Sequence, residues 1–297
     1  MINTKHLDPA FERRAMRLER NPGYRVLRAV PPAFSNMPDD GCPPDGKCVA
    51  LIDLETSGLN PEKDKIIQLA LMLVWVDEAG EVIGHFGPIA WFEDPGVPLD
   101  PRITMLTSIR SQDLTGKSIP DATVMGMLSR ADLLVAHNSS FEIGWLERRY
   151  PELKGAAWGC SMRDIDWLMT GFDARAQQHL LAQHGWFAQA HLADVDVWSL
   201  FVLLTERRKG WGADERRTHM QRLLAGAQKT TTMVEAQGTP IAKKDLLKAR
   251  GYRWYPAQRF WAKELDNVLI AHEQAWFYCK GLPAPTLRTI TAHERHR

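Results

Sequence analysis

The stretch "KCVALIDLETSGLNPEKDKIIQLALMLVWV", residues 47–76, decides the fold of this chain. An apolar run at 47–54 is followed by a Gly/Asn/Pro turn at 58–61 and a second apolar run at 65–76. Short apolar runs bounded by turn residues predict buried strands. A third strand is predicted at 81–92, after the turn "DEAG". Three sequential strands with a short turn between them predict an antiparallel meander.

Downstream of the meander, a proline-rich loop leads into alternating helical and strand patterns. A helix is predicted near 121–131, a strand at "DLLVAH" (132–137), and helices at 141–149, 164–184 and 195–208. After residue 230 the pattern restarts, with strands at "TTMVEA" and "RFWAKEL" and helices at "AKKDLLKARG", stopped by Gly251, and at 267–280. The prediction is a mixed α/β sheet with helices on its faces, plus a small second α/β module.

These patterns divide the chain into four segments. They are an N-terminal helix (within 6–28) with a proline-rich linker (1–46), the main α/β region (47–208), a basic connector (209–230), and a small accessory module with a tail (231–297). The linker assignment rests on five of the eighteen prolines, which lie between residues 31 and 46.

Composition narrows the class of protein. Hydrophobic residues make up 44% and charged residues 25% of the 297, which is ordinary for a soluble globular protein. The longest apolar run, 66–76, is interrupted by Gln68 and is far shorter than the ~20 residues that span a bilayer. With no apolar signal core at the N-terminus, we expect a cytoplasmic protein without membrane contact.

The four cysteines are scattered and form no C-x-x-C pair. Their pattern favours free thiols over a zinc site or a disulfide framework. They are Cys42, Cys48, Cys160 and Cys279.

Charge is distributed unevenly along the chain. The net charge is +4 over residues 1–30, −11 over 31–208 and +8 over 209–297. Basic segments suit polyanions, and concentrated acidic residues suit divalent metals. Ordinary solvated faces would give the same pattern, so charge alone leaves both interpretations open.

A pair of carboxylates closes the first strand. Asp53 and Glu55 are two residues apart, so strand geometry points both side chains to one face of the sheet. Two carboxylates at the edge of an apolar core are costly unless a positive charge neutralises them. Mg²⁺ or Mn²⁺ would do so, because hard cations take carboxylate oxygens. The pair alone is equally compatible with a structural or solvated role.

The wider context carries a family resemblance. "LIDLETSGL" (51–59) resembles the first motif of the DnaQ-like, or DEDDh, family of 3′→5′ exonucleases, and "LLVAHNSSFEIGWL" (133–146) resembles the second. "HLADVD" (191–196) is similar to the third, a histidine, four residues and an aspartate. The stretch at 97–114 resembles the family's connecting segment. Order and spacing agree across 47–208, about half of the chain.

The resemblance implies a ribonuclease-H-like core and a set of site residues. It implies that four acids hold two divalent ions, Mg²⁺ or Mn²⁺, and that His191 takes the proton from an attacking water; the four acids are Asp53, Glu55, Glu142 and Asp196. Thr56 and Asn138 adjoin the carboxylates and would touch the terminal nucleotide.

The implied activity is that of exonucleases similar to the epsilon proofreading subunit. The expected reaction is hydrolysis at nucleic-acid 3′ ends with release of nucleoside 5′-monophosphates, DNA being favoured over RNA. Two departures stand out: Glu142 replaces the family's aspartate, and Leu192 replaces the arginine that commonly follows the motif's histidine. The alternative is a catalytically weakened binding or scaffold component of a repair or anti-phage complex, recruited to a protein partner through the basic N- or C-terminal segment.

The last segment interleaves aromatic and basic residues, in "KARGYRWYPAQRFWAK" (248–263). This part resembles, more loosely, a subgroup of bacterial DnaQ-like proteins with a C-terminal extension. Base stacking and phosphate contacts are how proteins grip single strands. Arg253, Trp254 and Arg259 are therefore candidate substrate contacts, the alternative being that the aromatic side chains form the core of this module.

Overall fold

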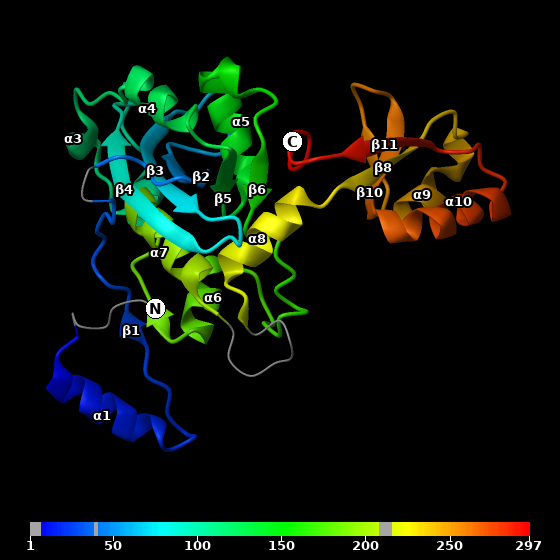
Figure 1. The fold of residues 1–297 in the computed structure, drawn as a ribbon. Coiled ribbons are helices and arrows are strands. Elements are labelled where there is room, and N and C mark those ends of the chain that lie inside the picture. Colours follow the sequence, from blue (N-terminus) through cyan, green and yellow to red (C-terminus); the bar gives the residue numbers. More distant parts are fainter. Residues whose placement is uncertain (1–6, 39–40, 208–215) are drawn as a thin grey trace. The chain divides into compact units, whose positions relative to one another are not determined.

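The computed structural model of the chain describes residues 7–38, 41–207 and 216–297. It divides into two compact units: Met1–Gly226 together with His296–Arg297, and Ala227–Arg295. Figure 1 labels most of the elements of both units.

A five-stranded mixed sheet forms the centre of the first unit, with strand order β4-β3-β2-β5-β6 (Figure 1). Its strands are β2 (Lys47–Thr56), β3 (Ile66–Val76), β4 (Val82–Phe92), β5 (Leu133–Ala136) and β6 (Trp158–Cys160). β2, β3 and β4 pair antiparallel, whereas β5 and β6 add parallel to β2. The predicted meander and mixed sheet are confirmed, and the arrangement is ribonuclease-H-like. β6 was not predicted, because three residues are too few to show a period.

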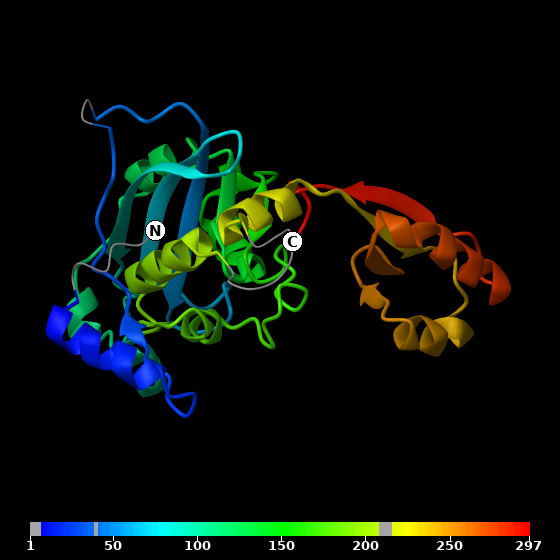
Figure 2. The ribbon, with the colours of Figure 1, turned by 60° about the horizontal axis from the view of Figure 1, so that its bottom comes forward.

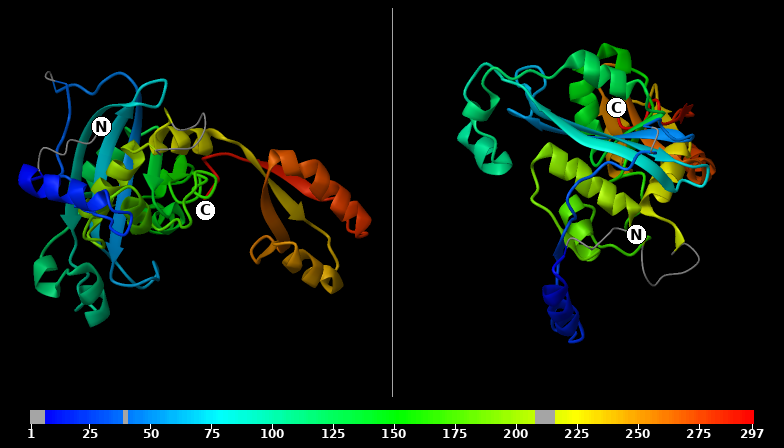
Figure 3. Two further views of the ribbon diagram at one scale, coloured as in Figure 1. Left: turned by 90° about the horizontal axis from the view of Figure 1, so that it is seen from below. Right: turned by 60° about the vertical axis from the view of Figure 1, so that its left-hand side comes forward.

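Helices cover both faces of this sheet, as the view along its edge in Figure 3 shows. They include α4 (Asp121–Leu128), α5 (Ser139–Arg149), α6 (Gln177–Gln183) and α7 (Ala193–Thr205). Ala50, Ile52 and Leu54 of β2 pack with Trp145 and Leu146 of α5. α7 contacts β2, β3 and β4. β3 is buried along its whole length, as expected of a strand covered on both sides.

The predicted helix at 164–184 is mostly wrong, because only α6 forms within it. The loop before α6 is held by side chain to backbone bonds: Trp167 Nε1 donates to Ser161 O (2.7 Å), and Asp164 accepts from Cys160 N (2.7 Å). Such local bonds offer the backbone an alternative to the helix. The helix-like spacing reflects side chains buried from a loop, such as Ile165.

Two short helices replace part of the loop predicted before residue 121. They are α2 (Pro101–Thr107) and α3 (Ser111–Leu114). The signal for α2 was local: Asp100 caps the helix by accepting from Arg102 N (2.8 Å), and Pro101 occupies its first position.

The N-terminal segment contains the expected helix, α1 (Pro9–Glu19), followed by extended chain. Its strand β1 (Arg28–Ala29) pairs with β7 (Trp186–Phe187). Arg28 ties the helix to this strand through ion pairs to Glu12 (2.6 Å) and Glu19 (2.9 Å).

All four cysteines are free, as predicted. Among the described residues, no helix is long and apolar enough to cross a membrane.

The described part of the predicted connector, 209–230, is largely helical. Residues 209–215 of the connector lie outside the described residues, and α8 (His219–Gln228) follows. Met220 and Leu223 of α8 are fully buried, so most of this helix belongs to the first unit.

The second unit has a four-stranded antiparallel sheet of order β11-β8-β10-β9. Its elements are β8 (Thr231–Ala236), α9 (Lys244–Ala249), β9 (Arg253–Tyr255), β10 (Phe260–Asp266), α10 (Ile270–Cys279) and β11 (Thr286–Ile290). Its core joins the sheet to both helices through Val234, Ala236, Leu247, Tyr252, Phe277 and Leu282 (Figure 2 gives a second view). The predicted strands at β8 and β10 and both helices are confirmed, while β9 and β11 were not predicted.

Candidate active site

Four acidic side chains converge from three elements of the first unit. Asp53 and Glu55 lie on one face of β2 near its end, Glu142 lies in the first turn of α5, and Asp196 lies in the first turn of α7. Each of these carboxylates lies close enough to another to disturb its ionisation. The four acids that the motifs predicted are therefore brought together, although 143 residues separate Asp53 from Asp196 in the sequence.

Burial and mutual repulsion raise the pKa of every acid in this cluster. Burial and the carboxylates of Glu142, Asp196 and Glu55 hold the pKa of Asp53 well above its usual range. Burial and Asp196 raise the pKa of Glu55 to about 7. Burial, with a further contribution from Glu55, raises the pKa of Glu142 to about 8. Burial also raises the pKa of Asp196, against the lowering effect of the His191 backbone N–H. All four cannot ionise together without a compensating cation.

His191 joins the cluster through its backbone as well as its ring. Its N–H donates to Asp196 Oδ2 (2.7 Å), and it has φ 67°, in the left-handed region that is uncommon for residues other than glycine. Its ring nitrogen and oxygens of Glu55 and Asp196 all lie within 4.8 Å of one another. An unfavourable backbone conformation at this position is consistent with a functional role for the imidazole.

The donor set fits divalent metal ions. Oε2 of Glu142 is buried and has no hydrogen-bond partner in the described structure. Among the described residues, no lysine or arginine forms an ion pair with any of the four acids. Carboxylate oxygens in this number suit Mg²⁺ or Mn²⁺.

The raised pKa values predict how pH changes stability without metal. Between the reference pKa of 4.5 and about 8, the folded protein binds more protons at Glu55 and Glu142 than the unfolded chain does. That stabilisation is complete below the reference value and is lost as pH rises through the folded pKa. The melting temperature in chelator should therefore fall from about pH 5 to about pH 8, and Mn²⁺ should restore it most at pH 8.

Thermal melts at both pH values, with chelator or with Mn²⁺, check this expectation. Glu142→Gln should flatten the pH dependence in chelator. A wild-type melting temperature in chelator that rises towards pH 8 would contradict it.

The other residues singled out from the sequence, Thr56, Asn138 and Leu192, lie in different environments. The hydroxyl of Thr56 donates to Gly58 O (2.6 Å), which leaves the lone pairs of that hydroxyl for a ligand. Asn138 precedes α5 and is exposed, and its side chain caps no N–H of the helix. Leu192 packs against the apolar cluster of Ile67 and Leu99. The segment that carries His191 is therefore anchored by apolar packing at Leu192.

Three glutamines hold the third motif, and sequence reasoning missed them. Gln177 Nε2 donates to Asp196 O (2.9 Å), and Gln178 Nε2 lies 3.4 Å from Asp196 Oδ1. Gln68 bonds both Ala193 and Asp194. Only Gln68 left a signal, as the polar residue inside an otherwise apolar run.

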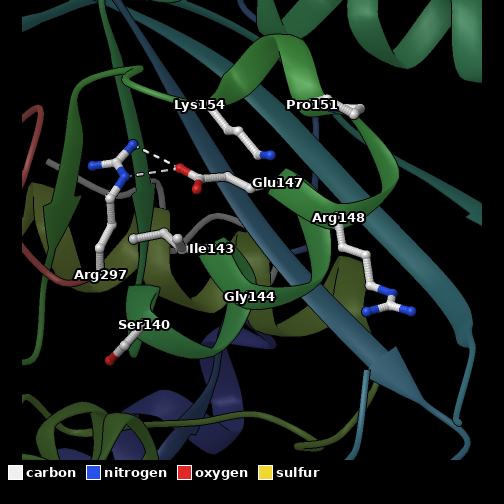
Figure 4. Close-up of a pocket in the computed structure, with 8 residues that line it drawn as sticks. All are labelled: Ser140, Ile143, Gly144, Glu147, Arg148, Pro151, Lys154 and Arg297. Atoms are coloured by element: carbon white, nitrogen blue, oxygen red, sulfur yellow. Dashed lines mark hydrogen bonds and ion pairs between the residues drawn. The ribbon is translucent and has the colours of Figure 1, made fainter. Parts of the chain in front are cut away.

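A hollow of about 530 Å³ lies along the outer side of α5 (Figure 4). Its lining residues are Ser140, Ile143, Gly144, Glu147, Arg148, Pro151, Lys154 and Arg297. Arg297 neutralises Glu147 at 2.7 Å. Arg148 and Lys154 are exposed and have no ion pair with any described residue, so the hollow is basic.

In the second unit, the aromatic residues of 248–263 divide between core and surface. Tyr252 is buried and donates to Glu273 (3.0 Å), as the core interpretation expected. Trp254 is 47% exposed, and its ring lies 5.7 Å from that of Trp261, its cross-strand partner. Arg253 and Arg259 are exposed. The candidate contacts of this unit are thus accessible.

Comparison with known proteins agrees with this geometry. The exonuclease family model RNase_T matches residues 50–178. DNA polymerase III PolC-type of Listeria innocua serovar 6a is 33% identical over 143 residues, which cover 44% of this chain and 9% of that protein. The chain thus spans only a small part of that relative's length.

Among solved structures, Exonuclease X in complex with 5′ overhanging duplex DNA has a TM-score of 0.39 at 22% identity, over 58% of this chain and 99% of that one. E. coli Exonuclease I in complex with a dA16 oligonucleotide has a TM-score of 0.43 at 16% identity, over 84% and 64%.

The first unit therefore combines a ribonuclease-H-like sheet with a cluster of four acids, and residues 50–178 of this unit match an exonuclease family model. Through this region the chain is similar to the DnaQ-like exonucleases, as its motifs indicated.

Proposed function

We propose that the protein is a metal-dependent 3′→5′ exonuclease that releases nucleoside 5′-monophosphates from nucleic-acid ends. The observation that carries the proposal is the buried cluster of Asp53, Glu55, Glu142 and Asp196, in which every pKa is raised and no described cation is paired. A catalyst of phosphodiester hydrolysis needs mainly positioning and charge neutralisation, which such a cluster supplies once it is loaded.

The residues of the chain would divide the work as follows. The four acids would hold two divalent ions, Mg²⁺ or Mn²⁺, which supply positive charge for the phosphate and make a bound water easier to deprotonate. His191 would accept the proton of the attacking water, which suits an imidazole at neutral pH. The backbone bond from His191 to Asp196 keeps that ring beside the acids. Thr56 and Asn138 would contact the terminal nucleotide.

DNA is the proposed substrate, with RNA as the alternative outcome. The support is that the curated relatives are DNA polymerases by name. The deciding experiment uses matched DNA and RNA strands, single and double, each blocked at one end and labelled at the other. We expect Mg²⁺-dependent loss of mononucleotides from free 3′ ends, inhibited by chelator. Undiminished cleavage in excess chelator would contradict the metal mechanism, and cleavage only from 5′ ends would contradict the polarity.

Variants of Glu142 distinguish between an active enzyme and a catalytically weakened binding protein. Its side chain is 4% exposed and its Oε2 has no partner, which supports a role as a ligand. Glu142→Gln removes the charge and should abolish most turnover. Glu142→Asp should retain or raise activity, because a misplacement of about 1 Å can cost ~10²-fold and the family places the shorter acid here.

Single-turnover rates of both variants at saturating Mg²⁺ test this. Full activity in Glu142→Gln would show that this position binds no metal. An inactive wild type that gains cleavage with Glu142→Asp would favour the weakened scaffold alternative.

Basic residues outside the acidic centre are the proposed contacts to the strand. They are Arg148 and Lys154 beside the hollow on α5, and Arg253 and Arg259 in the second unit. Replacing either pair with glutamine should weaken binding to long single strands. The slope of log affinity against log salt should fall by about 0.7 for each lost phosphate contact.

The matched control is Lys47→Gln/Arg130→Gln. Lys47 begins β2, six residues and so ~20 Å from Asp53, and Arg130 lies near the same end of the strand. This control should leave the salt slope unchanged. Equal slopes in all three variants and the wild type would remove the proposed nucleic-acid role of both pairs.

A further inference from the structure

Gln68 is the one polar side chain within the strand β3, where it is 1% exposed. It is the cross-strand partner of Glu55 in the pairing of β2 with β3. Cross-strand partners share a face of the sheet, with Cβ atoms about 5 Å apart. Gln68 therefore stands beside a proposed metal ligand, and a buried amide there needs partners of its own.

Both partners of Gln68 lie at the start of α7. Its Oε1 accepts the N–H of Ala193 (3.0 Å), and its Nε2 donates to Asp194 Oδ1 (3.2 Å). The orientation of the amide follows from these partners, because a backbone N–H needs an acceptor and a carboxylate needs a donor.

These bonds supply a helix cap that the local sequence lacks. The first N–H groups of a helix have no partner within the helix, and a polar residue at the N-cap usually accepts from one of them. The N-cap of α7 is Leu192, whose side chain has no acceptor. Gln68 provides one from the neighbouring strand, 125 residues away in the sequence.

The capped turn carries the third motif. Ala193 and Asp194 lie between His191 and Asp196, whose backbone and carboxylate are joined at 2.7 Å. Fixing Ala193 and Asp194 to β3 therefore fixes His191 and Asp196 relative to Glu55. These are the three residues whose ligand atoms meet within 4.8 Å.

We propose that Gln68 is a positioning residue that holds Asp196 in register with Glu55 for metal binding and keeps His191 beside them. The inference rests on the proposed metal-dependent function and adds to it the residue that sets the geometry of the site. Partners of metal ligands typically change affinity or activity by about 10- to 100-fold when they are removed. Gln68→Met, which keeps the volume and removes both bonds, should weaken Mn²⁺ binding by that factor.

A donor–acceptor exchange distinguishes positioning from general stability. Gln68→Glu keeps the acceptor for Ala193 but sets two carboxylates against each other at Asp194. Asp194→Asn alone keeps an oxygen that can accept from Gln68, so it should stay close to wild type. In the double variant Gln68→Glu/Asp194→Asn, the asparagine donates to the glutamate and the total charge equals that of the wild type. We expect it to recover most of the Mn²⁺ affinity that Gln68→Glu loses.

The experiment titrates Mn²⁺ into the full chain by electron paramagnetic resonance, with melting temperature, kcat and KM measured on the same samples. Ser199→Ala is the matched control, since Ser199 is a buried polar residue of α7 without a hydrogen-bond partner in the described structure. It should leave Mn²⁺ affinity unchanged. Gln68→Met should lower kcat more than it changes KM for the oligonucleotide.

Three results would overturn the inference. Wild-type Mn²⁺ affinity in folded Gln68→Met would show that the bonds do not position the site. Failure of Asp194→Asn to improve Gln68→Glu would show the same. A wild-type protein that binds no Mn²⁺ would overturn the metal mechanism and this role with it, whereas the first two results leave the proposed function intact.

Discussion

Asp53→Asn should reduce turnover by about 10³-fold or more while the fold is kept. A bound metal contributes several kcal/mol of transition-state stabilisation, and each 1.36 kcal/mol is a factor of ten in rate. The substitution also removes a carboxylate whose pKa is raised by burial and by three neighbouring acids. The melting temperature in chelator should therefore rise in the variant at the same time as activity disappears.

This opposite movement of activity and stability separates a metal ligand from a structural residue. Substitution of an aspartate with only a structural role would lower activity and melting temperature together. Asp45→Asn, an exposed aspartate outside the cluster, controls for the loss of one charge and should change neither. Single-turnover cleavage and melts in chelator measure the two quantities. Turnover by Asp53→Asn at the wild-type rate would contradict the assignment of the whole cluster as a metal site.

The sequence predicted the acidic centre because its information is local to each motif. Asp53 and Glu55 were placed on one face by the period of a strand, and that face is where the structure has them. Glu142 and Asp196 were placed at helix starts, and α5 and α7 begin there. The family resemblance then implied that these three elements meet at one site.

The supporting contacts could not be predicted, since they join residues that no local pattern relates. Gln68 meets Asp194 across 126 residues, and Gln178 meets Asp196 from a different helix. The predicted helix at 164–184 failed for a related reason. Side chains from a loop, such as Trp167, fill the core with a spacing that resembles a helical face.

Net charge correctly separated an acidic segment from basic ones, but it did not show where the individual charges lie. The acidic balance of 31–208 includes the four acids that the pKa shifts identify, but it hid the basic hollow formed by Arg148 and Lys154 in the same region. An average over many residues cannot show that opposite charges occupy separate places on one unit. A polyanion would meet these basic side chains outside the acidic centre.

His191→Gly is the sharpest test of the proposed proton acceptor. Glycine accepts the left-handed backbone of this position, φ 67°, and keeps the N–H that donates to Asp196. The fold and the carboxylates should therefore be undisturbed, and only the imidazole is removed. Loss of a general base typically costs about 10²- to 10⁴-fold in rate, and we expect kcat to fall in that range.

Because His191 is exposed, free imidazole should reach the space that the ring vacates and restore part of the rate. His191→Asn is the control: asparagine also tolerates this backbone conformation but fills the space without supplying a base, so imidazole should not rescue it. The comparison uses single-turnover rates at saturating Mg²⁺, with and without imidazole. Wild-type rates in His191→Gly would show that the imidazole is not needed for the reaction. Equal rescue of both variants would show that added imidazole acts elsewhere than in the vacated space.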